Sequence, residues 1–564
     1  MKKHKLLITL CAFFSVNFTS CSDLLTEKPD SFYEKDLYFS STANAKMAVT
    51  GIYDVLAKLG HYGQFEMAMP ASDDTYYING TGTDNTRRDI AHYTIKTTNT
   101  WIESIWEFKY QGLDRANFAI SGIENMSDYP NDKTLVALVA EARFLRALLA
   151  FDIIKYWGDA PFKTSYSSGY NEAFQPRQSR EQIYEQIIND LNFAKENLEW
   201  GSASSSPEKA NQGAARALLM RVLLQRCGYS LQMDGQMTRP EESKRTEYFN
   251  AIIKEWEAFN AKGYHRFYNK GYIELFKNFS AGTLNSEESI FEIAFYTPDG
   301  KAEDAGNWGT YNGPLVEAPG VKPTETSGYM GRANAFFRVV PEWRKFFEET
   351  DTRRDVMVCT YQYKWNKTLY NHQKVENPLG KDWYPGKWRR EWMPKGYIDP
   401  NNVNANYCLI RYADVVLMAA EAYNEIGSTP TAWILLNSVR TRSGATAITA
   451  SNYPTLLKAP RVYDLSFIND ADDKGKFRTA LYWERGFELA FEGQRKFDLI
   501  RWGIIKEALT LFGSNSEVNQ NIADDKKPYP AYINFKNGKD ELFPIPLSEI
   551  QSNPKLENKN NPSY

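Results

Sequence analysis

The segment that most constrains the fold is a long stretch that is apolar around most of a helix. Residues 133–157, KTLVALVAEARFLRALLAFDIIKYW, repeat apolar side chains at the three- and four-residue spacing of one helical face. Phe144, Leu148 and Phe151 extend this surface beyond that face. Because such a helix must be covered on more than one side, the segment predicts a buried helix within a helical scaffold. Gly158 predicts its end.

Other segments share this periodicity. Residues 179–198 open with Ser and Gln at the spacing of a capping box, and 211–226 follow as a partner helix with several small alanines. A pattern typical of a tetratricopeptide helix hairpin occurs in residues 411–427 and 431–444. One further helix is predicted at residues 479–503. The fold class is therefore mainly α, built on helical hairpins.

Two long stretches interrupt the helical pattern. Residues 296–332 and 67–94 lack periodicity but contain many aromatic side chains. Loops of this length are usually functional or disordered, and the aromatic residues argue against simple disorder. We expect one intertwined domain, residues 37–564, with long inserted aromatic loops. Its predicted parts are a helical scaffold, mainly 100–226 and 410–505, and a loop-rich insert at about 228–410.

The N-terminus predicts export. Three lysines precede an apolar run at residues 6–18, which is too short for a spanning helix of about 20 residues. Residues 1–20 therefore predict a removable signal peptide. Cys21 follows directly, as in bacterial lipoproteins whose new N-terminal thiol takes a diacylglycerol group. We expect a lipid anchor at Cys21 and a polar tether at 21–36; the alternative is an ordinary signal peptide with an accidental cysteine.

Charge and cysteine content exclude several classes of protein. The chain has 67 basic and 70 acidic side chains, so it offers no basic field for nucleic acid. Beyond the signal and Cys21, three cysteines remain, at 227, 359 and 408, and this odd number does not indicate a disulfide framework. Neither the cysteines nor the histidines have the spacing of metal ligands. We expect no cofactor and no metal.

Several motifs together resemble one family. They are CSDLLTEKPD after the lipidation cysteine, AEARFLRALLAFDIIKYWGDAPF, RYADVVLMAAEAYNEIG, LNSVRTRSG, ERGFELAFEGQRKFDLIRWG and the C-terminal LFPIPLSEIQSNPKLENKNNPSY. In this order they resemble the SusD/RagB-like lipoproteins of Bacteroidetes-type bacteria over essentially the whole mature chain.

The resemblance implies an irregular tetratricopeptide-type scaffold with inserted loops, lipid-anchored in the outer membrane and exposed at the cell surface. It also implies that the protein binds a nutrient for a TonB-dependent, SusC-like transporter barrel. Most relatives are linked to glycans and some to peptides, so the identity of the ligand does not carry over.

The aromatic loops supply the candidate binding residues. A sugar ring has an apolar C–H face that can stack on an aromatic ring, while amide and charged side chains hold its hydroxyls. We expect an oligosaccharide to bind a platform formed by several of these residues: Asp73, Asp74, Tyr76, Tyr77, Asn79, Tyr296, Asn307, Trp308, Tyr311, Asn312, Tyr329, Trp383, Tyr384 and Trp388. For each single ring, burial beneath a loop is the competing interpretation.

Two other functions stay open. Glu484, Glu488 and Glu492 recur every four residues in a predicted helix, so Glu488 and Glu492 could form the carboxylate pair of a surface glycoside hydrolase. The simpler interpretation is that Arg485, Arg495 and Arg501 neutralise these glutamates within the scaffold. No serine-hydrolase, zinc-hydrolase or P-loop motif occurs. We expect a non-catalytic protein; the remaining alternative is a binder of peptides or another non-sugar nutrient.

Overall fold

The computed structural model describes residues 38–68, 72–78, 82–297, 303–320, 329–395, 401–452, 461–468 and 470–564. The predicted signal peptide, Cys21, the tether and Asn79 lie outside these ranges. Among the described residues, no helix has both the length and the apolar character needed to cross a membrane.

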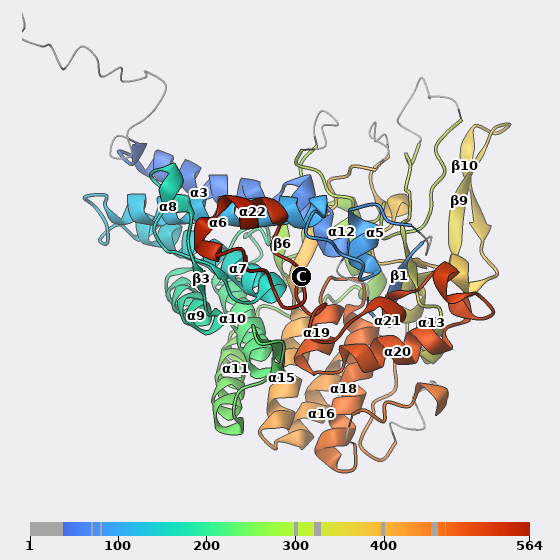
Figure 1. Ribbon diagram of the computed structural model, residues 1–564. Helices are drawn as coiled ribbons and strands as arrows, with labels where there is room; N and C mark the ends of the chain where they lie inside the picture. The colour runs from blue at the N-terminus through green and yellow to red at the C-terminus, as the bar shows by residue number, and fades with distance from the viewer. Residues whose placement is uncertain are drawn as a thin grey trace, which may run out of the picture.

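Six long helices form the first part of the scaffold, which is blue to green in Figure 1. Each packs against the next, and α3 also contacts α7. In chain order they are α3 (Thr42–Leu56), α6 (Thr100–Glu124), α7 (Lys133–Trp157), α9 (Arg180–Asn197), α10 (Gln212–Cys227) and α11 (Glu242–Lys262).

Helix α7 confirms the prediction from its apolar spacing. The Asp132 side chain accepts a hydrogen bond from the Thr134 backbone N–H at its start, and Gly158 ends it with a φ of 69°. Its buried side chains lie on nearly all faces, since α3, α6 and α9 all contact it. The Arg146 guanidinium pairs with Asp190 of α9 at 2.7 Å, so the two helices are joined by charge as well as by packing.

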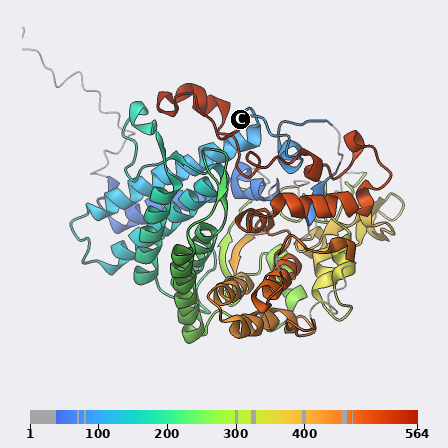
Figure 2. The same cartoon turned by 60° about the horizontal axis from the view of Figure 1, so that its bottom comes forward.

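The second part of the scaffold is orange to red. It contains α15 (Tyr412–Glu425), α16 (Thr429–Thr441), α18 (Asp473–Leu489), α19 (Arg495–Arg501) and α20 (Ile505–Asn515). The predicted hairpin is confirmed as α15 and α16, which pack against each other across a turn at Gly427. Figure 2 shows α15 beside the green α10 and α11, and both of these helices contact it.

The single helix predicted at 479–503 is wrong. Helix α18 ends at Leu489, and Phe491 and Gly493 have φ values of 67° and 80° in the turn before α19. The Tyr407 hydroxyl donates to the Glu492 carbonyl at 2.9 Å, which holds this turn against β12. Glu492 therefore lies outside the helix on which the sequence places it.

Short strands and helices lie between and beside the helical blocks. Strand β6 (Ser289–Ile293) pairs antiparallel with β12 (Tyr407–Arg411), and β1 (Thr75–Tyr77) with β7 (Phe337–Val339). Strands β9 (Tyr361–Asn366) and β10 (Asn371–Glu376) form the hairpin at the right of Figure 1. The remaining strands are β2 (Ala160–Pro161), β3 (Arg177–Gln178), β4 (Ser230–Leu231), β5 (Met237–Thr238), β8 (Val358–Cys359) and β11 (Tyr384–Pro385). The remaining helices include α4 (Phe65–Ala68), α5 (Arg87–Ala91), α8 (Tyr170–Ala173), α12 (Tyr272–Ala281), α13 (Glu342–Phe346), α14 (Arg353–Met357), α21 (Ala531–Asn534) and α22 (Leu547–Ser552).

Two findings differ from the predicted division of the chain. Helix α11 lies within the predicted loop-rich insert, yet it packs between α10 and α15 as part of the scaffold. The C-terminal segment returns to the N-terminal helices: the Trp157 indole N–H donates to the Pro544 carbonyl, and the Asn561 amide donates to the Trp157 carbonyl, both at 3.0 Å. One continuous core accordingly includes residues from Phe39 to Leu556.

Candidate ligand-binding site

Most of the candidate platform residues are buried. Trp308 is 0% exposed, stacks on Tyr407 at a centroid distance of 4.2 Å and donates its indole N–H to the Tyr62 carbonyl. Trp388 packs on Trp308 and donates to the Asn406 carbonyl at 3.2 Å. Burial beneath a loop, the competing interpretation for each single ring, therefore holds for these two rings and also for Tyr76, Tyr77 and Tyr384. All five rings serve as core beneath the loops.

The glycines around Trp308 allow close packing rather than ring exposure. Gly309 has a φ of 80°, and a Cβ there would lie 2.6 Å from the Met393 side chain. A Cβ on Gly313 would lie 2.3 Å from the Gly309 carbonyl oxygen. The loop is therefore folded tightly on itself and on the segment that contains Trp388.

The polar candidates in these loops are buried as well. Asp73 is held by Arg495, with nitrogen–oxygen distances of 2.7 and 2.8 Å, and Asp74 accepts from the Ser72 hydroxyl at 2.7 Å. Asn307 donates to the side chain of Asn402 at 2.9 Å. The Asn312 carbonyl oxygen accepts from the Gly309 backbone N–H at 2.8 Å. These side chains fix the loops to the scaffold.

Four aromatic candidates keep accessible surface. Tyr296 is 70% exposed, while Tyr311, Tyr329 and Trp383 are half-buried. The Trp383 indole N–H donates to the Asn377 carbonyl at 3.0 Å, and Tyr329 lies parallel to His372, near the turn of the β9–β10 hairpin. Of these four, Tyr311 belongs to a larger group of rings.

This group surrounds one guanidinium, and we call it the Arg87 cluster. It consists of Arg87 of α5, Trp101 of α6, Tyr77 of β1, Tyr311 from the glycine-rich loop and Phe336 directly before β7. The Arg87 Cζ lies 4.1 Å from the Phe336 ring centroid and 5.5 to 5.8 Å from the other three. Tyr77 is buried and the other four side chains are half-buried, so the cluster forms part of the surface.

The geometry of the cluster is suited to a flat, hydroxylated ligand. Tyr311 meets Phe336 edge to face at 4.7 Å, and Tyr77 is parallel to Phe336 at 5.9 Å. Arg87 Nε and the amide nitrogen of Asn312 are buried and, within the described part of the chain, have no hydrogen-bond partner, so neither faces the surface. The half-buried guanidinium of Arg87 nevertheless places a cation with N–H donors beside the apolar ring faces.

The sequence did not single out Arg87, Trp101 or Phe336. Arg87 stands within the aromatic stretch 67–94, but Trp101 and Phe336 lie just beyond the two stretches considered. Only the pairing of β1 with β7, residues far apart in the chain, brings them together.

The same glycine-rich loop continues to the β9–β10 hairpin. Val316 forms a bridge with Tyr363, and the Trp365 backbone N–H donates to the Glu317 carboxylate at 3.0 Å. His372 contacts the Glu317 carbonyl at 2.8 Å. The Arg87 cluster and the hairpin are thus connected by residues 311–317.

Glu488 and Glu492, the pair considered for hydrolysis, are buried among cations together with Glu484. Arg353 lies 2.5 Å from Glu484 and 3.0 Å from Glu488. Arg411 lies 2.5 Å from Glu488 and 2.7 Å from Glu492. The other cations that pair with these glutamates are Arg440, Arg442 and Lys387.

The sequence suggested the wrong arginines as the partners of these glutamates. Arg485, Arg495 and Arg501 bind carboxylates on other elements: Asp414 and Asp498, Asp73, and Glu421 and Asp498, respectively. The simpler interpretation still holds, because every one of the three glutamates is neutralised inside the scaffold.

Glu488 does not have the properties of a catalytic acid. Burial alone would raise its pKa, but the guanidinium groups of Arg442, Arg411 and Arg353 hold the pKa at about 2. A general acid in a glycosidase keeps its proton near neutral pH. Among the described residues, no group of three or more His, Cys, Asp or Glu side chains could hold a metal ion.

Comparison with known proteins assigns the family. Residues 233–564 match the SusD family, and residues 23–224 match a family described as starch-binding and associating with the outer membrane. The first match covers more than half of the sequence, so the chain belongs to the SusD family. This confirms the resemblance seen in the sequence.

Individual relatives match over nearly their whole length. SusD-like proteins P25 and P2 of Formosa agariphila are 25% and 27% identical, over 99% and 100% of this chain and 98% and 100% of their own. A SusD homolog from Bacteroides thetaiotaomicron has a TM-score of 0.77 at 26% identity, over 94% of this chain and 98% of its own. Surface glycan-binding protein A from the same organism, solved with laminarihexaose, has a TM-score of 0.64 at 18% identity, over 92% and 99%, and shows the shared fold.

Proposed function

We propose that this protein is a lipid-anchored protein of the cell surface that binds oligosaccharide and delivers it to a TonB-dependent, SusC-like transporter barrel in the outer membrane. Binding takes place at the Arg87 cluster, and no bond is cleaved. The observation that carries this proposal is the set of half-buried rings of Trp101, Tyr311 and Phe336 around one guanidinium.

The chemistry of the cluster supports glycan rather than peptide as the first ligand class to test. Ring faces provide apolar contact for the C–H face of a sugar, and the guanidinium donates to hydroxyl oxygens without requiring a charged ligand. Family membership supports the same choice, since the match over residues 23–224 is described as starch-binding. Laminarihexaose, bound by a protein of the same fold, is a suitable first probe.

The loop architecture supports a site that is formed before the ligand arrives. Tyr77 is buried and stacked on Phe336, and Trp308 and Trp388 pack beneath the glycine-rich loop that carries Tyr311. Because the rings are held in place by packing, binding costs little additional ordering of side chains. A small contact area then gives a complex that can release its ligand to the next protein.

The anchor and the transporter partner rest on the sequence and the family. A diacylated Cys21 would hold the protein at the membrane, since each buried methylene contributes about 0.8 kcal/mol. The family description places related proteins at the outer membrane. Lipid labelling with a radioactive fatty acid that persists in a Cys21→Ala variant would contradict the anchor.

The binding experiment uses protein that starts after Cys21 and isothermal titration calorimetry. Laminarihexaose, maltohexaose and a panel of short peptides are the probes. Trp101→Ala and Tyr311→Ala are expected to weaken glycan binding at least tenfold, whereas Tyr170→Ala, which removes a ring that is 76% exposed on α8, leaves it unchanged. The proposal is overturned if only peptides bind, if the cluster variants bind glycan normally, or if the glycan is cleaved.

A further inference from the structure

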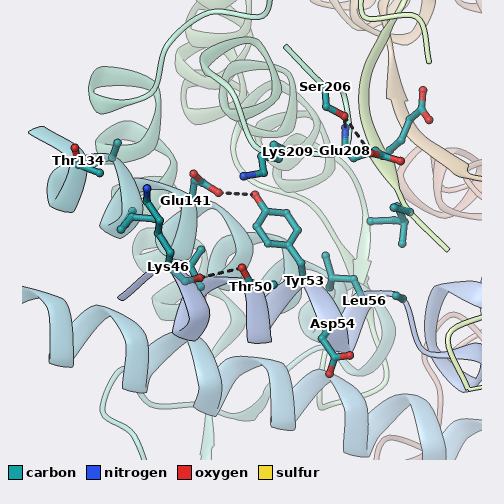
Figure 3. A pocket seen from close by; sticks show the side chains of 17 residues that line it. Lys46, Thr50, Tyr53, Asp54, Leu56, Thr134, Glu141, Ser206, Glu208 and Lys209 are labelled. Carbon is teal, nitrogen blue, oxygen red and sulfur yellow. Dashed lines mark hydrogen bonds between the residues drawn. The ribbon is translucent and has the colours of Figure 1, made fainter. Parts of the chain in front are cut away.

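A second cavity lies apart from the Arg87 cluster, between the N-terminal helices and the central strand pair (Figure 3). Its volume is about 640 Å³, and residues of α3, α7, the α9–α10 connection and the end of β6 line it. No member of the Arg87 cluster lines it. Its occupant, if it has one, is therefore independent of the proposed glycan site.

One wall of the cavity is apolar. Val49 and Leu56 of α3, Leu138 of α7 and Ile293 of β6 line it, and all four are buried in the core. These four side chains offer aliphatic contact, and the ring of Tyr53 also lines the cavity. A chain of methylene groups has a complementary surface on the aliphatic wall.

The other wall has three carboxylates, of Glu141, Glu208 and Glu292. Figure 3 shows the Tyr53 hydroxyl directed at Glu141, to which it donates at 3.1 Å. The amide nitrogen of Asn406 donates to both Glu208 and Glu292, at 2.9 Å in each case. One amide thus holds two carboxylates close together, and no ion pair within the described residues relieves the repulsion between them.

Glu292 provides the main evidence that the cavity has a ligand. It is 2% exposed, and its Oε1 atom has no hydrogen-bond partner in the described part of the chain. Burial raises the pKa of Glu292 to about 7, against the hydrogen bonds from the side chains of Ser289 and Asn406, and the nearby Glu208 carboxylate adds to the rise. A buried carboxylate normally has a cationic partner, as Glu488 does with three arginines.

The lysines at the cavity do not supply that partner. Lys46 and Lys209 line it, but both side chains are exposed, and neither forms an ion pair with the three carboxylates in the described structure. The Lys209 charge acts on Glu141, where it opposes the rise in pKa caused by burial. Asp54, the remaining acid of the lining, is already paired with Lys58 and Arg115. The inner end of the cavity is therefore anionic and the outer end is not.

We propose that this cavity binds an aliphatic amine, with its ammonium group against Glu292 and Glu208 and its methylene chain along the apolar wall. An ammonium group provides three donors and a positive charge. The donors match the unpartnered Oε1 of Glu292, and the charge matches the adjacent carboxylates of Glu292 and Glu208. An anion would be repelled, and a neutral alcohol would leave the carboxylates without charge compensation. The amine is either a free diamine or the side chain of a lysine residue.

The test is calorimetry on protein that starts after Cys21, with 1,5-diaminopentane and Nα-acetyl-lysine N-methylamide as separate probes. Pentan-1-ol and pentanoate have the same aliphatic body and serve as ligand controls. We expect one or both amines to bind and both controls to fail. Binding of the diamine alone identifies a free amine as the ligand, and binding of the lysine derivative alone identifies a peptide side chain.

Two variants test separately whether amine binding depends on the carboxylate charge and on the open volume of the cavity. Glu292→Gln keeps the shape and the bond from Asn406 but removes the charge, and it should weaken amine binding at least tenfold. Ala137→Phe fills the cavity from a half-buried position on α7 and should abolish binding. The matched control is Glu257→Gln, an exposed carboxylate of α11 outside the cavity.

Glycan binding provides the control for folding, since neither cavity variant should change the affinity for laminarihexaose. The proposal is overturned if neither amine binds with a dissociation constant of about 1 mM or lower, which corresponds to about −4 kcal/mol. It is also overturned if pentan-1-ol binds as tightly as the amines, or if Glu292→Gln binds amine as tightly as the wild type. If the wild-type protein binds amine but does not bind glycan, the result contradicts the proposed function and leaves the amine site supported.

Discussion

Replacing Glu488 with glutamine removes one negative charge from the centre of the buried ion-pair network. The Glu488 side chain is 0% exposed and accepts hydrogen bonds from Arg353, Arg411 and Arg442. Glutamine has the same shape, but its amide nitrogen is a donor. At least one guanidinium then loses one of its acceptors, and all three arginines lose the negative charge of Glu488.

The magnitude follows from the pKa of this group. The pKa falls from the ordinary 4.5 to about 2, against the effect of burial, because the arginines favour the charged form. Each pKa unit corresponds to about 1.4 kcal/mol, so the charged form contributes about 3 kcal/mol at neutral pH. Removing one partner of a buried pair costs about 3–5 kcal/mol by general experience, which agrees.

The assay is thermal unfolding of the wild type and the variant as a function of pH. With an unfolding entropy of about 2.1 cal/mol/K per residue, a loss of 3 kcal/mol lowers the melting temperature by about 3 °C in a chain of this size. The difference should be full above pH 4.5, because the pKa is depressed in the folded state, and it should shrink as the pH falls through 4.5 towards 2.

The matched control is Glu274→Gln on α12, where the carboxylate is half-buried at the surface and pairs with the half-buried Lys277 at 2.7 Å. A surface pair of this kind contributes at most about 1 kcal/mol. If the two variants unfold at the same temperature, the argument that Glu488 is held by charge is refuted.

Three further predictions concern other parts of the molecule. Trp308→Ala should lose about 3–5 kcal/mol of stability, because it leaves a cavity beneath the glycine-rich loop, and the melting temperature measures this. Gly493→Ala should cost about 1–2 kcal/mol, because the φ of 80° is unfavourable for alanine; chemical denaturation of the two proteins tests it. Glu292→Gln should be more stable than the wild type at pH 8, by up to about 3 kcal/mol, because a raised pKa makes the wild type lose stability as the pH rises from 4.5 through 7. That difference should vanish below pH 4.5 in melting curves, and a constant difference would show that Glu292 does not titrate as inferred.

The helices of the scaffold could be predicted because their signal is local. Helix α7 begins at Lys133 and ends at Trp157, where its apolar spacing and Gly158 place the boundaries. The end of α18 could not be predicted in this way. The sequence around Glu492 keeps a helical pattern of charges and apolar residues, and the break depends on positive φ values and on a contact from Tyr407, which is distant in the chain.

The candidate site was predicted less well, since exposure of a ring is not a local property. Trp308 and Tyr311 lie three residues apart in one glycine-rich loop, yet the first is fully buried and the second is half-exposed. Their surroundings differ because Trp308 meets Tyr62 and Tyr407, whereas Tyr311 meets Arg87 and Phe336. All of these partners come from other segments, so aromatic composition could indicate the region but not the individual residues.

The buried rings nevertheless have a part in ligand binding, through the loops that they support. The strands in this region are short, so backbone pairing alone gives the loops little rigidity. Packing of Trp308 and Trp388 against the core, with glycines that allow the close approach, fixes the segment that carries Tyr311. A ring that is fixed before binding loses less side-chain entropy when a ligand stacks on it. The high aromatic content of the chain therefore has two uses: a few rings can meet the ligand, and a larger number hold those few in place.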